Sequence, residues 1–246
     1  MPNLTLNLGQ VKITPFFWSL AISVVLASFF FWRKLREDYA DEEIFKTTLI
    51  LFFSSFFFSR LIFIFFHLEK FDFSLGRWLS ISTFPGFSVL GAFWGGVLTL
   101  AWMFSKYKIN IWEGLDSLSQ PLLIFVSLGG LGSFLEKGSL RGLAFSGVGI
   151  LGFVVLEFLR KRYRTFSWYK SGKTGFLFWS TSLYVFALCS ILDFVLGVAL
   201  YLEELFWCLT ILVSVGIIYY RSERDFKEDF RKLIKRRKKG ESCLSV

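Results

Sequence analysis

The sequence contains seven blocks of 16 to 26 residues that are almost entirely apolar. A helix that crosses a bilayer core of about 30 Å needs roughly 20 apolar residues, because each residue adds about 1.5 Å of rise. The apolar residues of a soluble domain would instead recur with a period of 2 or 3.6. The sequence therefore predicts an all-α, polytopic membrane protein with seven transmembrane helices, at residues 15–32, 45–66, 84–104, 115–135, 143–159, 175–200 and 205–220.

The cationic residues are divided unequally between the two sides of these predicted spans. The segments after the first, third, fifth and seventh spans hold 22 of the 28 Lys and Arg residues, counting Lys46 at the start of the second span. Lys and Arg collect on the cytoplasmic side of short loops, so we expect the N-terminus outside and the C-terminus in the cytoplasm. Residues 1–246 are predicted to form a single membrane domain, of which residues 221–246 are a basic cytoplasmic tail.

The basic tail directly follows the last predicted span. Attraction of its cations to anionic lipid headgroups, at about 1 kcal/mol for each cation, is therefore a better explanation than nucleic-acid binding. With 54% hydrophobic and only 19% charged residues, the composition excludes a disordered chain and argues against a soluble enzyme.

Ionisable residues inside a bilayer are informative, because a charge at the bilayer centre costs on the order of 3 kcal/mol. Arg60, His67, Glu136 and Asp193 lie in or at the outward ends of predicted spans, and Glu157 lies at a cytoplasmic end. In one interpretation Arg60 pairs with Asp193 or Glu136 only to neutralise its charge. In the other, Arg60 holds an anionic ligand at outer-leaflet depth and a carboxylate orients it. His67, the single histidine, is predicted to be an interfacial residue rather than a base.

Glycines gather in the outward parts of the third and fourth predicted spans. Gly91 and Gly95 have the spacing of a small-residue packing motif, and three further glycines fall within residues 129–132. Close packing of helices explains most such patterns. A break in a helix that turns backbone amides toward a ligand is the alternative.

These features, in this order, resemble the prolipoprotein diacylglyceryl transferase family over roughly residues 45–194. The Gly-Arg of the family's second span is similar to residues 59–60, and its Gly-x-Ser motif, which continues to Gly-Gly, is similar to residues 86–92. The family's glycine-rich signature is similar to residues 129–136, and its final Arg and Glu, four residues apart, are similar to Cys189 and Asp193.

The sequence departs from the family pattern at four positions. Leu90 stands where the family has His or Tyr, Gly130 and Cys189 where it has Arg, and Ser133 where it has Asn. The resemblance leaves Asp193 and Glu136 as candidate catalytic residues, in place of the family's Glu and Asn. It leaves as candidate substrate-binding residues Arg60, Ser88, Gly91, Gly132 and Ser133.

The family reaction, as the resemblance implies it, transfers the diacylglyceryl group of phosphatidylglycerol to the cysteine thiol of a prolipoprotein lipobox and releases glycerol phosphate. The expected partners are phosphatidylglycerol, the lipobox segment and other membrane lipids, without nucleic acid, metal or cofactor. The expected location is the plasma (inner) membrane of a bacterium.

Two other functions remain open. A catalytically inactive homologue that binds phospholipid or serves as a scaffold is consistent with the substitutions at Leu90, Gly130 and Cys189. A small-solute transporter is less well supported, because the inner halves of the predicted spans offer almost no polar path across the membrane.

Overall fold

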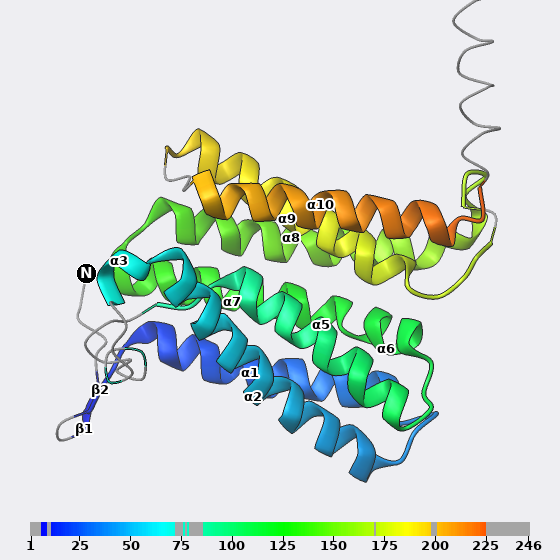
Figure 1. Cartoon of the computed structure of the whole chain (residues 1–246), viewed down its shortest axis with the longest axis horizontal. Helices are drawn as coiled ribbons and strands as arrows, with labels where there is room; N and C mark the ends of the chain where they lie inside the picture. The colour runs from blue at the N-terminus through cyan, green and yellow to red at the C-terminus, as the bar shows by residue number, and fades with distance from the viewer. Residues whose placement is uncertain are drawn as a thin grey trace, which may run out of the picture.

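The computed structural model describes residues 6–8, 11–71, 76, 78, 86–169, 171–197 and 201–224. Within these ranges, seven helical segments are long and apolar enough to cross a membrane, which confirms the predicted fold class (Figure 1). They are α1 (Pro15–Leu35), α2 (Asp41–Phe66), α5 (Val89–Lys106), α6 (Ile111–Ser117) continued by α7 (Ser119–Lys137), α8 (Leu140–Arg162), α9 (Phe176–Val195) and α10 (Tyr201–Arg221).

Short elements lie at the two ends of this bundle. The antiparallel strands β1 (Leu6–Leu8) and β2 (Val11–Ile13), which the sequence analysis did not predict, lie at the left in Figure 1 with α3 (Leu68–Phe71). We call this the hairpin end and the opposite end the α6 end. A 3₁₀ turn (Tyr163–Thr165) follows α8 at the α6 end.

The predicted spans differ from the observed helices at several boundaries. The third begins at Val89 rather than at residue 84, because Gly86–Ser88 are not helical. The fourth consists of two helices that meet at Leu118. The sixth and seventh are separate helices, as predicted, and residues 198–200 of the sixth lie outside the described residues.

The glycines predicted to pack helices lie inside continuous helices and against neighbouring backbones. A Cβ atom on Gly91 of α5 would come within 2.7 Å of the Cα of Ser59 on α2. A Cβ on Gly132 of α7 would come within 3.0 Å of the Cα of Phe16 on α1. Close packing, and not a broken helix, therefore accounts for these two glycines.

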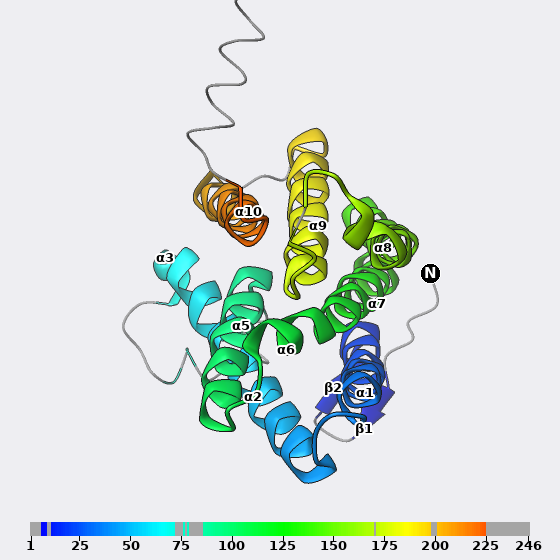
Figure 2. The same ribbon diagram turned by 90° about the vertical axis from the view of Figure 1, so that its right-hand side faces the viewer.

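Aromatic side chains fill the interior between α5 and α9. The ring of Phe93 lies parallel to that of Phe178, with centroids 5.6 Å apart, and packs edge-on against Phe186 at 4.9 Å. Trp94 donates from its indole nitrogen to the hydroxyl of Thr210 on α10 over 3.1 Å. Figure 2 shows α5, α9 and α10 around this region.

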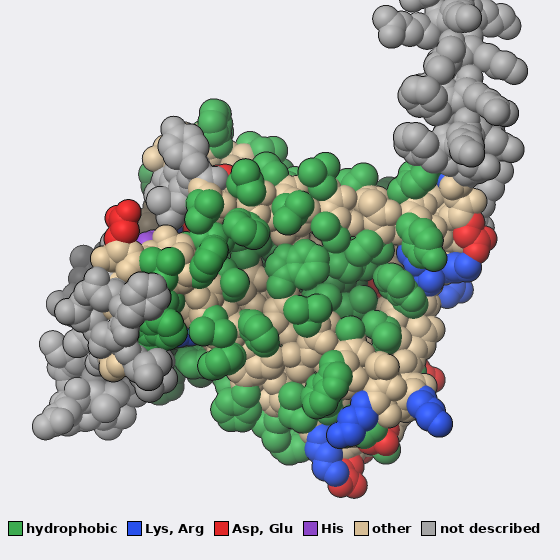
Figure 3. Space-filling view, viewed as in Figure 1, with side chains coloured by type: hydrophobic (Ala, Val, Ile, Leu, Met, Phe, Trp, Pro, Cys, Tyr) green, Lys and Arg blue, Asp and Glu red, His purple; other side chains and the backbone are tan. Residues whose placement is uncertain are grey.

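Hydrophobic side chains cover the visible flank of the bundle, whereas most cations lie at the α6 end (Figure 3). The exposed side chains include Phe53, Trp102 and Phe194. Such a surface is suited to lipid rather than water.

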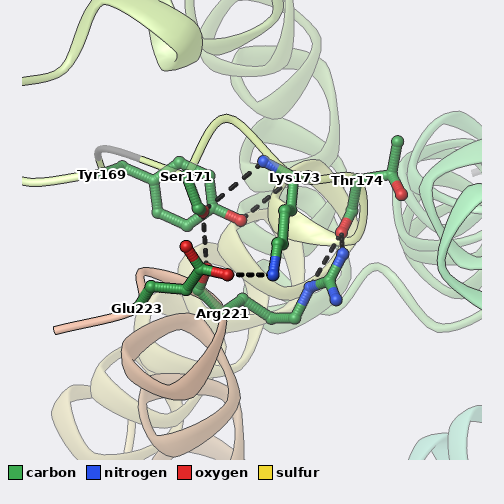
Figure 4. A network of polar contacts seen from close by, with 6 residues as sticks. All are labelled: Tyr169, Ser171, Lys173, Thr174, Arg221 and Glu223. Atoms are coloured by element: carbon green, nitrogen blue, oxygen red, sulfur yellow. Dashed lines mark hydrogen bonds and ion pairs between the residues drawn. The ribbon is translucent and has the colours of Figure 1, made fainter.

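A polar network fastens the loop before α9 to the end of α10 (Figure 4). Arg221 donates from Nε and Nη2 to the carbonyl of Thr174 over 3.1 and 2.6 Å, and Ser171 donates to the carbonyl of Arg221. Lys173 pairs with Glu223. The hydroxyl of Tyr169 donates to the carbonyl of Lys173, and burial raises the pKa of this tyrosine above its ordinary value.

Asp116 of α6 caps the first turn of α9 from outside that helix. Its carboxylate oxygens accept hydrogen bonds from the backbone N–H groups of Gly175 and Phe178 over 2.7 and 3.0 Å. These N–H groups belong to the helix terminus, where they have no partner within the helix and attract negative charge. Asp116 thus fixes the start of α9 against α6.

We expect Asp116→Ala to lower the unfolding free energy by about 1 to 2 kcal/mol, the usual cost of losing a helix cap. Asp116→Asn keeps one acceptor oxygen and is expected to lose less. Denaturant titration of the purified protein in detergent micelles measures both values. Equal losses in the two variants would contradict the capping role.

Candidate functional site

Arg60 lies near the hairpin end of α2 and fastens the segment before α5 to that helix. Its side chain donates from Nε to the carbonyl of Trp78 over 3.1 Å and from Nη1 to the carbonyl of Gly86 over 3.0 Å. Its guanidinium carbon lies 5.0 Å from the centre of the Phe71 ring. Only 8% of Arg60 is exposed. The arginine therefore places a buried positive charge beside the start of α5.

Ser88 is the residue immediately before α5 and is joined to α2 by two hydrogen bonds. Its N–H donates to the carbonyl of Ser59 over 3.1 Å, and the Ser59 hydroxyl donates to the carbonyl of Ser88 over 2.8 Å. The hydroxyl of Ser88 itself is buried and has no hydrogen-bond partner in the described part of the chain. Leaving a buried hydroxyl unpaired costs about 1 to 3 kcal/mol.

The start of α5 therefore combines three features that suit an anionic group. The first N–H groups of a helix attract negative charge, the Ser88 hydroxyl can donate a hydrogen bond, and Arg60 supplies a positive charge nearby. Gly91 in the first turn lets α5 approach the backbone of α2. Of the predicted site residues, Arg60, Ser88 and Gly91 are brought together here.

His67 ends α2 close to this group. Its ring stacks on that of Phe63 at a centroid distance of 4.4 Å, and the guanidinium of Arg60 lies 5.8 Å from the same ring. Its Nδ1 lies 3.0 Å from the carbonyl of Phe63, which only accepts hydrogen bonds. Nδ1 therefore acts as the donor in this hydrogen bond, and Nε2 is the ring nitrogen that could contact a ligand.

Asp193 forms an ion pair with a residue that the sequence analysis did not single out. The two carboxylate oxygens accept hydrogen bonds from Nε and Nη2 of Arg141 over 2.6 and 2.5 Å. Asp193 is 1% exposed, whereas the Arg141 side chain is 38% exposed. This bidentate pair joins the end of α9 to the first turn of α8.

Glu136 lies in a third place, on α7. Its carboxylate accepts a hydrogen bond from the Thr14 hydroxyl over 3.0 Å, and it is exposed. Gly132 packs against α1, and Ser133 follows it on α7. Neither Glu136 nor Asp193 pairs with Arg60 among the described contacts, so the predicted neutralisation of Arg60 by one of them is not observed.

Arg141 was missed because it falls between two predicted spans, where a cation is ordinary. The signal that could have found it is that few cations lie on the predicted outward side of the spans. A buried carboxylate on that side, such as Asp193, therefore has few candidate partners, and Arg141 is one of them.

Three of the positions that depart from the family pattern are buried among neighbouring helices, and at Gly130 the packing leaves no room for a side chain. A Cβ on Gly130 would lie 2.5 Å from the backbone nitrogen of Ser146 and 2.7 Å from the carbonyl oxygen of Gly142, both on α8. Leu90 is a core residue, 3% exposed. Cys189, 2% exposed, lies one turn before Asp193 on α9.

The family model of prolipoprotein diacylglyceryl transferase matches residues 3–238, nearly the whole chain. Among individually curated proteins, none matches. The matched range includes all three groups of predicted site residues.

Proposed function

Because the chain belongs to the prolipoprotein diacylglyceryl transferase family, we propose that it transfers a diacylglyceryl group from phosphatidylglycerol to the cysteine thiol of a prolipoprotein lipobox. The family acts in lipoprotein biosynthesis on lipid and prolipoprotein substrates, and the chain is a multi-pass membrane protein. In the proposed orientation the hairpin end faces the outside of a bacterial plasma membrane and the α6 end faces the cytoplasm, because most cations lie at the α6 end.

The reaction forms a bond between the cysteine sulfur and the glycerol carbon of the diacylglyceryl group. It breaks the bond between that carbon and the phosphate oxygen, so glycerol phosphate leaves with the bonding electrons. The thiol proton passes to a base, a role that we assign to Glu136, an exposed carboxylate at the hairpin end. Charge on the departing phosphate must be stabilised by positioned donors and cations.

We assign phosphate binding to Arg60, Ser88 and the first N–H groups of α5, with Gly91 allowing their close approach. Asp193 acts by orienting Arg141, since both of its oxygens are already engaged by that guanidinium. Gly132 and Ser133 are assigned to the face of α7 that receives the precursor. The observation that supports this assignment best is the buried, unpartnered hydroxyl of Ser88 at a helix N-terminus.

We expect Ser88→Ala to weaken phosphatidylglycerol binding about tenfold to a hundredfold, the value of one hydrogen bond to a charged group, without lowering stability. The stability should be kept because the lost hydroxyl has no partner within the described residues. Binding is measured for the purified protein in nanodiscs, and thermal unfolding is recorded in parallel.

Ser182→Ala is the matched control, because this serine is also fully buried but donates to the carbonyl of Phe178 within its own helix. It should leave lipid binding unchanged. If Ser88→Ala binds phosphatidylglycerol as tightly as the parent protein, the assignment of the anion site to the start of α5 is wrong.

The packing around Gly130 favours a second candidate function, binding of phospholipid without transfer. The family's arginine has no room there, because the backbone of α8 closes the position. Incubation of the protein with phosphatidylglycerol and a lipobox peptide, followed by mass spectrometry, separates the two candidates. A peptide heavier by one diacylglyceryl group supports transfer, whereas lipid binding with an unmodified peptide supports the inactive homologue.

A further inference from the structure

We propose that a groove on the outer face of α8, at the α6 end, binds an anionic phospholipid from the adjacent leaflet. The groove is open and has a volume of about 550 Å³. It lies at the opposite end of α8 from Arg141 and does not depend on the transfer reaction. It is lined by Phe153, Val154, Glu157, Phe158, Lys161 and Arg162.

The lining residues form one stripe along α8, because positions three, four and eight residues apart share a helix face. Val154 and Phe158 are 68% and 52% exposed, so this stripe is not covered by another helix. Phe153 also packs against the core and forms the inner wall of the groove. The stripe is apolar toward the middle of α8 and cationic at its end.

The length of the stripe corresponds to one leaflet. From Phe153 to Arg162 the helix rises about 14 Å, and half of a bilayer core is about 15 Å thick. An acyl chain lying on Phe153, Val154 and Phe158 would therefore bring its headgroup to Lys161 and Arg162.

The charge at the end of the groove favours an anion. Residues 157–164 contain four cations and one carboxylate. A carboxylate oxygen of Glu157 lies 3.9 Å from Nη1 of Arg160 and the other lies 3.6 Å from Nζ of Lys161. Even if it neutralises one cation fully, the positive charge remains in excess.

Arg162 is the residue best placed to bind a phosphate. Its guanidinium lies over the Phe158 ring at 5.2 Å, which holds the cation beside the groove instead of letting it extend into water. In the described part of the chain its side chain makes no hydrogen bond or ion pair, so its N–H donors are available to a phosphodiester.

The test compares two double variants that each remove two cations at the α6 end. Lys161→Gln with Arg162→Gln removes the cations of the groove. Lys34→Gln with Arg36→Gln is the matched control, because Arg36 also lies over an aromatic ring, that of Trp32 at 4.9 Å, but does not line this groove. Each full-length protein is purified in nanodiscs containing equal amounts of phosphatidylglycerol and phosphatidylcholine, and its retained lipids are counted by native mass spectrometry.

We expect the groove variant to retain phosphatidylglycerol about tenfold to thirtyfold less well, the effect of two cations near a membrane surface. The control variant should lose much less, because its two cations do not lie beside the groove that would hold the acyl chain. A third variant, Val154→Trp, fills the groove without changing charge and should reduce retention of both lipids. Equal losses in the two double variants, or no loss in the groove variant, would overturn the proposal, and neither result depends on whether the protein transfers diacylglyceryl groups.

Discussion

Arg141→Ala is expected to lower the unfolding free energy by about 3 to 5 kcal/mol, the usual cost of leaving one partner of a buried ion pair alone. The loss is large because Asp193 is 1% exposed and both of its oxygens bind Arg141. Without the arginine, the buried carboxylate loses the partner that engages both of its oxygens. Denaturant titration in detergent micelles measures the change.

The ion pair also predicts an asymmetry between its two members. Asp193→Asn leaves Arg141, whose side chain is 38% exposed and can turn toward water or headgroups, so it should cost less than Arg141→Ala. The double variant Arg141→Ala with Asp193→Asn should recover most of the stability lost by Arg141→Ala alone. If the two losses simply add, the pair is not coupled and the interpretation fails.

Gly130→Arg restores the residue that the family pattern has at this position, yet we expect it to lower the unfolding free energy by at least about 3 kcal/mol and to bring no gain in transfer. Even its first side-chain atom would lie 2.5 Å from the backbone nitrogen of Ser146, and backbone cannot move aside as a flexible side chain can. Overpacking of this kind typically costs 1 to 3 kcal/mol and more where a helix must shift.

Gly129 offers a matched control for this substitution. It is the neighbouring residue on α7, and a Cβ there would meet nothing within 4 Å. Gly129→Arg therefore adds the same charge to the same helix without a clash against α8, and it should lose less stability than Gly130→Arg. Transfer activity and thermal unfolding of the two variants are compared side by side. A stable Gly130→Arg protein with higher transfer activity would contradict this expectation. It would show that α8 can shift to make room for an arginine at this position.

Much of the architecture could be predicted because it depends on local composition. Seven apolar blocks are enough to predict seven membrane helices, and the division between the sixth and seventh required only the polar residues near position 203. The start of α5 at Val89 could not be predicted, because the non-helical segment Gly86–Ser88 depends on bonds to Ser59 and Arg60 on another helix.

The site was harder to predict because it depends on how each helix is rotated. Arg60 and Ser88 were both predicted to bind substrate, and the structure brings them together at the start of α5. Depth alone could not show that Asp193 turns toward Arg141, a residue 52 positions away, or that Glu136 turns toward Thr14. Contacts between side chains of different helices are set by packing, which a single sequence does not reveal.

The polar network around Arg221 has a mechanical consequence for the whole bundle. The chain joins α9 to α10 at the hairpin end, and the network joins them again at the α6 end. The two helices thus form a closed ring that is fastened at both ends. By contrast, α5 meets this ring through the aromatic side chains of Phe93 and Trp94, without close approach of the backbones. The printed contacts across the seam between α5 and this ring are thus made by side chains, and the seam leads to the helix end that carries Ser88.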